Sequence, residues 1–150
     1  MIITSTSSAE TKKIAELLGQ SVLQGGNGPL IVALEGDLGA GKTTFIKGLA
    51  RGLGIRKNIT SPTFLMVRRY DIPRSRSNFK NFYHVDAYRM SSARDLETTG
   101  LIDALHDKRN IIAVEWADRI KKNLPQKVIR IAIAHQKENE RRILFVAKKK

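Results

Sequence analysis

The sequence contains no cysteine and no long apolar run. The absence of cysteine excludes a disulfide framework and a zinc knuckle. No apolar segment approaches the roughly 20 residues that a membrane-spanning helix requires, so we expect no membrane association. The N-terminal segment Met1–Lys13 lacks the apolar core of a secretory signal, which favours a cytoplasmic protein.

Acidic residues are also scarce, with 14 Asp and Glu against 27 Lys and Arg and a net charge of +13. Residues 1–50 hold four basic and four acidic residues, residues 51–110 hold twelve and six, and residues 111–150 hold eleven and four. The surplus therefore lies in the last two thirds of the chain. Such a surplus is typical of a protein that contacts a polyanion, although a solvated basic surface explains it equally well.

With 150 residues, of which 41% are hydrophobic, the chain is long enough to bury a core. We expect one globular domain that covers residues 1–150.

A phosphate-binding motif stands near the start of this domain. Gly36, Gly41, Lys42 and Thr43 match the pattern G-x-x-x-x-G-K-[ST]. The apolar residues 30–34 before it predict a buried strand, and the spacing of apolar residues over 44–53 predicts a helix. Strand, glycine-rich loop and helix follow one another in the order that a P-loop requires.

The chemistry of this loop is that of a nucleotide site. Gly36, Gly39 and Gly41 permit positive φ, so successive backbone N–H groups can turn inward and hold the α and β phosphates. Lys42 is expected to reach the β and γ phosphates, and the Thr43 hydroxyl is expected to ligate Mg²⁺. We predict that ATP is bound by Asp37, Leu38, Gly39, Ala40, Gly41, Lys42, Thr43 and Thr44.

Two further acids stand where strands are expected to end. Residues 111–114 are apolar and lead to Glu115, as in a Walker B element, although no Asp precedes it. Asp86 closes the predicted strand 79–86. Asp86 and Glu115 are therefore predicted to hold Mg²⁺ or orient water, and His84 is expected to be packed or hydrogen-bonded. Trp116 can stack near the nucleotide or fill the core, and a large apolar ring favours the core.

The segment between these sites contains a candidate switch and a basic hairpin. Pro62 stiffens the segment 59–64, where Thr60, Ser61 or Thr63 can face a γ-phosphate or its metal, although an ordinary turn fits these residues better. Residues 64–72 and 79–86 predict a hairpin. Its basic residues alternate with aromatic ones, which suits either RNA contact or a buried apolar face; they are Arg68, Arg69, Arg74, Arg76 and Lys80, with Tyr70, Phe79, Phe82 and Tyr83.

The remaining segments complete an α/β fold. A capping box at Ser7–Glu10 predicts a helix that ends near residue 25. Residues 92–106 and 118–123 predict helices, residues 128–134 and 142–147 predict a terminal pair of strands, and the lysines of 148–150 are expected to be a solvated tail. The expected architecture is a P-loop NTPase domain with a mixed central sheet flanked by helices, a β-hairpin and C-terminal antiparallel strands.

Five segments together resemble the bacterial TsaE (YjeE) family over nearly the whole chain. They are GDLGAGKTT (36–44), TSPTF (60–64), HVDAYR (84–89), DLETTGL (95–101) and VEWADR (114–119). The resemblance implies an ATPase needed to make threonylcarbamoyladenosine beside the anticodon of tRNAs that read codons starting with A. It also implies TsaD and TsaB homologues as partners, with tRNA reached through that complex and no role for DNA.

The resemblance assigns ATP and Mg²⁺ to four matching residues, which are Lys42, Thr43, Asp86 and Glu115. It also favours a switch-like role for the TSPTF segment and hence a catalytic role for Thr60. The one departure is a hairpin tip, residues 73–80, that is longer and more basic than the family pattern.

Two other functions remain open from the residues. A small-molecule kinase also places a P-loop in a short α/β chain, but no clear D-x-R acceptor motif follows the P-loop helix. A nucleotide-gated scaffold, in which binding and not hydrolysis matters, is the third reading.

Overall fold

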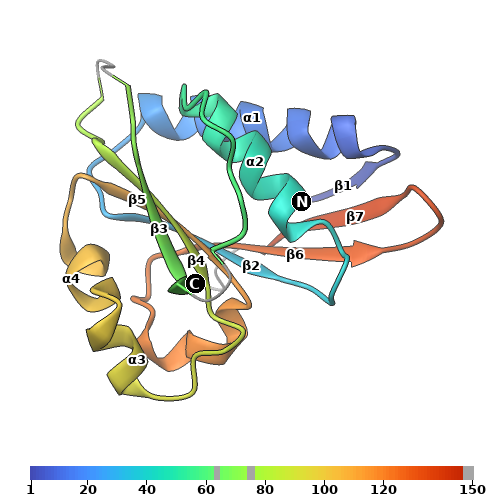
Figure 1. Ribbon diagram of the computed structural model, residues 1–150. Helices are drawn as coiled ribbons and strands as arrows, with labels where there is room; N and C mark the ends of the chain where they lie inside the picture. The colour runs from blue at the N-terminus through green and yellow to red at the C-terminus, as the bar shows by residue number, and fades with distance from the viewer. Residues whose placement is uncertain (63–64, 74–76, 147–150) are drawn as a thin grey trace.

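The computed structural model describes residues 1–62, 65–73 and 77–146, which form one sheet of seven strands with helices on both faces (Figure 1). The strands are β1 (Ile2–Ser5), β2 (Leu30–Glu35), β3 (Val67–Asp71), β4 (Asn81–Asp86), β5 (Asn110–Glu115), β6 (Ile129–His135) and β7 (Arg141–Val146). The helices are α1 (Ser8–Gln24), α2 (Lys42–Gly52), α3 (Ala93–Thr98), α4 (Leu101–His106) and the 3₁₀ helix η2 (Ala117–Asn123).

The sheet order is β1-β7-β6-β2-β5-β4-β3. The four central strands β6, β2, β5 and β4 run parallel, whereas β3, β7 and β1 pair antiparallel with their neighbours. The predicted mixed sheet, hairpin and C-terminal antiparallel pair are therefore confirmed. Because the central strands are parallel, β2, β4 and β5 all end at the same edge of the sheet.

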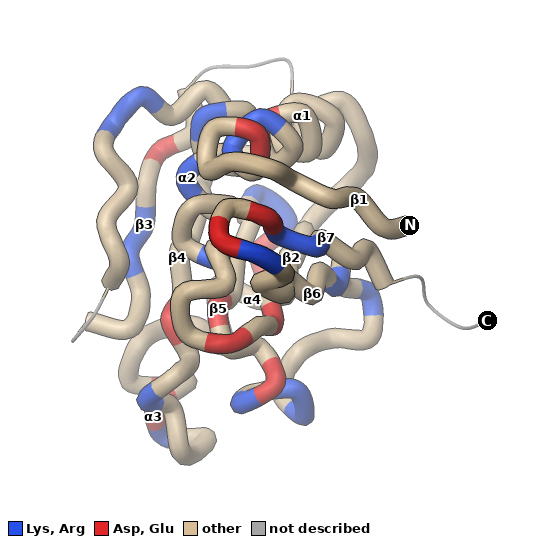
Figure 2. Tube along the Cα trace, turned by 90° about the vertical axis from the view of Figure 1, so that its right-hand side faces the viewer, with Lys and Arg blue, Asp and Glu red and all other residues tan. Residues whose placement is uncertain are grey.

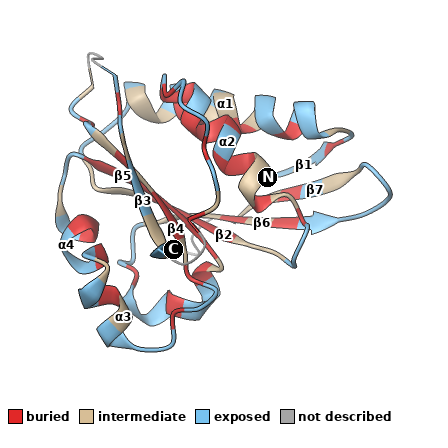
Figure 3. Ribbon diagram, in the orientation of Figure 1, coloured by how far each residue is buried: buried red, intermediate tan, exposed pale blue. Residues whose placement is uncertain are grey.

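Strand β2 is apolar at nearly every position because it is covered on both faces. Val32 and Leu34 point into a core beneath α1 and α2, and Ile31 and Ala33 point into a second core beneath α3, α4 and η2. Figure 3 shows the buried residues concentrated on β2, β5 and β4 between these two layers. A continuous apolar run is the pattern expected for a parallel strand buried on both sides.

Helix α1 begins at the predicted cap, with one difference in the second half of the box. The Ser7 hydroxyl accepts a hydrogen bond from the Glu10 backbone N–H at 3.0 Å, as expected. The Glu10 carboxylate accepts from the backbone N–H and the hydroxyl of Thr6, at 2.7 and 2.6 Å, and not from Ser7. These bonds lower the pKa of Glu10.

Helices α1 and α2 lie unusually close because glycines line their contact. A Cβ atom at Gly48 would overlap the carbonyl oxygen of Lys12, and one at Gly52 would overlap that of Glu16. The sequence does not predict this contact, because a glycine inside a helix ordinarily indicates a less stable helix and not a packing site. Here it lets the P-loop helix pack directly against the backbone of α1.

Three helix predictions required correction. The predicted helix 92–106 is two helices, because Gly100 takes a φ of 75° between α3 and α4. Helix α2 begins at Lys42, two residues before the predicted start, and residues 117–123 are 3₁₀. In the part of the chain that the structure describes, no helix is both long and apolar enough to cross a bilayer.

The basic hairpin buries its aromatic residues. Phe79 and Phe82 are buried, and Tyr70 packs against the same core, so stacking on RNA bases is not open to them. Arg69 is already engaged, with an ion pair to Asp71 at 3.3 Å and a hydrogen bond to Asn81 at 2.7 Å. Arg74, Arg76 and the tail 148–150 lie outside the described residues, and the other basic residues are spread over several elements, β3 and β7 among them (Figure 2).

The α1–α2 contact predicts that Gly48→Ala and Gly52→Ala destabilise the protein. Alanine normally stabilises a helix relative to glycine, but here the added methyl group overlaps the backbone of α1, and such overpacking costs about 1–3 kcal/mol. Urea unfolding measures the change, with Ser21→Ala on the exposed face of α1 as a control. An unchanged or raised midpoint for both glycine variants would show that the two helices can separate at no cost.

Candidate functional site

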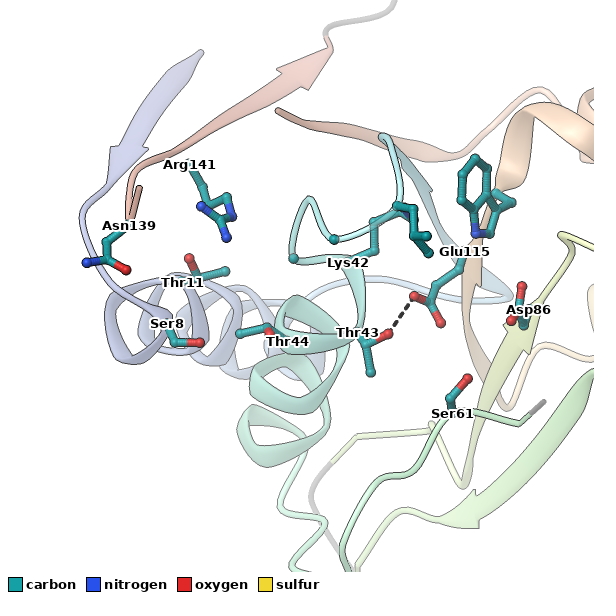
Figure 4. A pocket seen from close by; sticks show the side chains of 14 residues that line it. Ser8, Thr11, Lys42, Thr43, Thr44, Ser61, Asp86, Glu115, Asn139 and Arg141 are labelled. Carbon is teal, nitrogen blue, oxygen red and sulfur yellow. Dashed lines mark hydrogen bonds between the residues drawn. The ribbon is translucent and has the colours of Figure 1, made fainter. Parts of the chain in front are cut away.

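A cavity of about 390 Å³ opens at the edge where β2, β4 and β5 end (Figure 4). The loop between β2 and α2 forms its floor, with Gly39, Gly41, Lys42 and Thr43 among the lining residues. Asp86 and Glu115 reach it from the ends of β4 and β5, where they are register partners. The sheet thus brings the predicted phosphate loop and both predicted acids together.

The loop has the backbone geometry of an anion site. Gly39 and Gly41 have φ values of 78° and 106°, which L side chains rarely adopt. Gly41 caps α2 without any side-chain hydrogen bond to the first turn. The N–H groups at this helix start are therefore available to an anion, and the helix dipole favours negative charge there.

Two predicted loop residues contribute through the fold of the loop. The backbone carbonyl oxygen of Asp37 accepts a hydrogen bond from the Ala40 backbone N–H at 3.0 Å, and this bond closes a turn. The Asp37 side chain is exposed. Ala40 is buried in the core below. Neither lines the cavity as the structure describes it, whereas Leu38 and Thr44 do.

Lys42 is held inside the loop. Its ammonium group donates to the carbonyl oxygens of Gly36 and Asp37, the latter at 2.9 Å, and lies 4.2 Å from the centroid of the Trp116 ring. Burial lowers the pKa of Lys42, while the nearby carboxylate of Glu115 opposes this shift most strongly. A largely buried cation held by two carbonyl dipoles is a group that an incoming phosphate can recruit at short range.

Glu115 joins three elements around the cavity. One carboxylate oxygen accepts the Thr43 hydroxyl at 2.8 Å, and the other lies 2.7 Å from Nε2 of His84. Glu115 is only 5% exposed. The start of α2 and the ends of β4 and β5 are thereby fixed to one another through a single side chain.

His84 was predicted only as a packed or hydrogen-bonded residue, and it is both. It is fully buried, and its Nδ1 has no partner among the described residues. Because an ionised carboxylate only accepts, Nε2 of His84 is the donor in the contact with Glu115. The spacing of His84 and Asp86 indicates that both side chains lie on the same face of β4. Only the pairing of β4 with β5 shows that Glu115 lies beside them.

Of the three switch candidates, Thr60, Ser61 and Thr63, the structure brings Ser61 to the cavity. Thr60 is exposed and does not line the cavity in the described structure, whereas Ser61 does. Thr63 lies outside the described residues. Asp86 accepts the Tyr88 backbone N–H at 3.0 Å through one oxygen, and its side chain faces Ser61 across the cavity (Figure 4).

Trp116 does not simply fill the core as predicted. It packs at the margin of the second core, takes the left-handed conformation with a φ of 56°, and lines the cavity. Its ring lies 4.9 Å from that of Tyr88. The tryptophan is therefore part of the cavity wall beside Lys42.

Four lining residues were missed by sequence reasoning. Ser8 and Thr11 come from the start of α1, and Asn139 and Arg141 come from the β6–β7 hairpin. No motif marks them as site residues, because they reach the cavity only through the packing of α1 on α2 and the pairing of β6 with β2.

The donor set suits a magnesium nucleotide better than a free metal ion. Within the described residues, no group of three or more His, Cys, Asp or Glu side chains converges. Mg²⁺ ordinarily takes one or two protein oxygens and completes its octahedron with water and substrate phosphates. Thr43, Glu115 and Asp86 supply oxygens of that kind at the end of the cavity nearest Lys42.

A family model for "Threonylcarbamoyl adenosine biosynthesis protein TsaE" matches residues 5–143. The chain belongs to the TsaE family. A TsaE relative from Bacillus subtilis, named tRNA threonylcarbamoyladenosine biosynthesis protein TsaE, is 41% identical over 92% of this chain and 80% of its own. The protein of that name from Treponema pallidum is 32% identical over 93% of this chain and 95% of its own.

A solved structure agrees with the TsaE assignment. The crystal structure of Bacillus subtilis YdiB superposes with a TM-score of 0.72 at 33% identity, over 97% of this chain and 83% of that one. The resemblance drawn from the five sequence segments is therefore confirmed at the level of family and fold.

The position of Glu115 predicts that Glu115→Ala lowers the free energy of unfolding without nucleotide. It leaves Thr43 and the buried His84 without their acceptor, which costs about 1–3 kcal/mol. Urea unfolding measures this, with Asp86→Ala as the matched control because the bond given for that carboxylate within the described residues is to an exposed backbone N–H. Greater stability in Glu115→Ala would mean that burying the carboxylate costs more than its bonds contribute.

Proposed function

We propose that the chain binds and hydrolyses ATP with Mg²⁺, and that this turnover supports threonylcarbamoyladenosine formation in tRNA. The observation that carries the proposal is the convergence of Lys42, Thr43 and Glu115 at the start of α2, inside one cavity. The TsaE relatives are named for biosynthesis of this modified nucleoside. Homologues of TsaD and TsaB are the proposed partners.

Each side chain has a distinct proposed role. The N–H groups at the start of α2 and Lys42 bind the phosphates, because both offer donors to an anion. The Thr43 hydroxyl, which donates to Glu115 in this structure, would hold Mg²⁺, and the metal would neutralise phosphate charge. Glu115 and Asp86 orient the attacking water, since both carboxylates stand at the end of the cavity beyond Lys42.

Ser61 replaces Thr60 as the preferred switch residue in this proposal. It is the described residue of the 60–62 segment that lines the cavity and faces Asp86. A γ-phosphate at that end can therefore be sensed by a segment that continues into the exposed surface at Leu65. In NTPases, a segment that is ordered by contact with the γ-phosphate and released on hydrolysis couples hydrolysis to partner binding.

Contact with tRNA by the hairpin is a weaker part of the proposal. Of its basic residues, Arg68 and Lys80 are exposed, but Arg69 is paired with Asp71. Because Phe79 and Phe82 are buried, phosphate contact by the exposed basic side chains is the mode that we propose for the described part of the hairpin.

Lys42→Ala is expected to lose nucleotide binding and, in cells, the modified nucleoside. The substitution removes the ammonium charge held inside the loop while leaving the loop N–H groups in place. Isothermal titration calorimetry with ATP and Mg²⁺, and mass spectrometry of tRNA nucleosides from a complemented depletion strain, give the two readouts. Lys121→Ala, at an exposed position of η2, is the matched control.

Normal ATP affinity in Lys42→Ala would contradict the P-loop assignment. Lost ATP binding with unchanged modified nucleoside would separate the site from tRNA modification.

Glu115→Gln and Asp86→Asn are expected to reduce ATP hydrolysis at least tenfold while changing ATP affinity less than threefold. The amides keep the size of each side chain but lose the charge that acts on metal and water. Single-turnover hydrolysis with the TsaD and TsaB homologues present measures the rate, and calorimetry measures the affinity. If the hydrolysis rate and the ATP affinity fell by the same factor, both acids would act in nucleotide binding and not in hydrolysis, as in a nucleotide-gated scaffold.

A further inference from the structure

A second cavity is formed by α1, α2 and the loop that follows α2, and it shares no described lining residue with the cavity of the proposed ATP site. Its volume is about 650 Å³. Figure 2 shows basic residues gathered beside α1 and α2. We call this cavity the basic groove, because five cationic side chains and one carboxylate line it; they are Lys12, Lys47, Arg51, Arg56 and Lys57, with Glu16 as the acid.

The end of α2 turns the following loop back toward the helix. Gly54 takes a φ of 85°, and the Ile55 backbone N–H donates to the carbonyl oxygen of Ala50 at 3.0 Å. A glycine in this conformation is a common way to end a helix and reverse the chain. Ile55 and Ile59 are both buried in the core that α1 and α2 cover. The loop between them is therefore anchored at each end, while its cationic side chains are exposed.

The cations of the basic groove are exposed and, in the part of the chain that the structure describes, form no ion pair. Glu16 lies 4.0 Å from Lys13, which is not among the described residues that line the groove. Like charges that gather without counter-ions repel one another and lower the stability of the fold. An anion that binds in the groove relieves this repulsion, so the groove is a favourable anion site.

The basic groove continues toward the β3–β4 hairpin. A Cβ atom on Gly54 would stand 3.6 Å from the ring of Pro73, which follows β3. The preceding residue, Ile72, donates its backbone N–H to the carbonyl oxygen of Lys80 at 2.8 Å. The exposed Lys80 thus lies near one end of the groove. Cations that extend over three elements suit a chain of phosphates better than a single small anion.

The lining of the groove favours the sugar–phosphate backbone of RNA over an acidic protein. Protein interfaces are centred on aromatic and other large side chains and are depleted in lysine. The described lining residues include no aromatic side chain, and the apolar ones, Ile55 and Ile59, are buried. Cationic and amide side chains without a stacking surface contact phosphates, which carry no sequence information.

We propose that the basic groove binds the phosphate backbone of tRNA. The choice of tRNA rests on the proposed function, in which the chain supports modification of that RNA. The contact itself needs neither ATP nor its hydrolysis, because the groove and the ATP cavity have no described lining residue in common. Binding is expected to be independent of base sequence and strongly dependent on salt.

Fluorescence anisotropy with a labelled, unmodified tRNA transcript tests the proposal. The triple variant Arg51→Gln, Arg56→Gln, Lys57→Gln removes three charges from the groove and keeps long polar side chains. Its dissociation constant for tRNA is expected to rise at least about tenfold, because charge-assisted contacts to phosphates are lost. The slope of log K against log salt is expected to fall by about 2 to 3, since each phosphate contact contributes about 0.7 to 0.9.

The matched control removes the same net charge from the other face of the sheet, where α3, α4 and η2 cover the second core. It is the triple variant Arg94→Gln, Lys121→Gln, Lys122→Gln, at exposed positions of α3 and η2. Its dissociation constant for tRNA is expected to change less than about threefold, because salt screens distant charges. Each measurement is repeated with saturating ATP and Mg²⁺, which separates RNA in the phosphate loop from RNA in the groove.

Calorimetry with ATP and Mg²⁺ is expected to give unchanged affinity in both triple variants. Equal losses of tRNA affinity in the two triple variants would show a response to net charge alone and overturn the groove as a site. A loss confined to Arg68→Gln and Lys80→Gln would place the RNA on the hairpin and overturn it as well.

Two further outcomes would also overturn the proposal. The first is that the wild type binds no tRNA at low salt, either alone or with the TsaD and TsaB homologues. The second is that the groove variant keeps its tRNA affinity but fails to capture those homologues without RNA, which would assign the groove to a protein partner. In both cases unchanged ATP binding would leave the proposed function standing, whereas a wild type that binds tRNA but not ATP would reject that function and keep the groove.

Discussion

The carboxylate of Glu115 is the group on which the geometry of the cavity depends. It stands at the end of the fully buried strand β5 and accepts hydrogen bonds from α2 on one side and β4 on the other. Burying a carboxylate costs free energy unless its oxygens accept hydrogen bonds. The positions of Thr43 and His84, which supply these bonds, are therefore constrained together with that of Glu115. The P-loop helix and the strand that carries Asp86 thus have their relative position set before any ligand arrives. This is preorganisation achieved with one side chain.

Lys42 shows how the same site balances charge without a ligand. Its ammonium group lies among loop carbonyls and the Trp116 ring, and the surrounding carboxylates partly offset the burial that lowers its pKa. Within the described residues, Lys42 is held by two carbonyl oxygens and not by an ion pair. A phosphate that enters the loop would therefore be the first fully charged partner in direct contact with the ammonium group.

The sequence predicted those parts of the site that are local along the chain. The glycine pattern, the acid at the end of each strand and the cap of α1 are each encoded within a few residues, and each was located. The contacts of His84 with Glu115, and of Ser5 with Thr11, depend on which strands are neighbours or on a buried turn that no motif describes. Arg141 is the extreme case, because it reaches the cavity only once β6 lies beside β2 and β7 pairs with β6. Trp116 was assigned to the core because a large apolar ring is usually buried, whereas its left-handed backbone turns it toward the cavity.

Strand β1 pairs with β7 alone, and the Met1 carbonyl oxygen accepts the Phe145 backbone N–H at 2.9 Å. During synthesis on the ribosome, β1 and the start of α1 emerge first but have no neighbour in the sheet until residues 141–146 have been made. Helix α1, which carries Thr11, can pack against α2 once residue 52 has been made, whereas the wall that carries Arg141 is added only with β7. A nascent chain can therefore form its phosphate loop early, yet its cavity is complete only after residues 139–141 have been made.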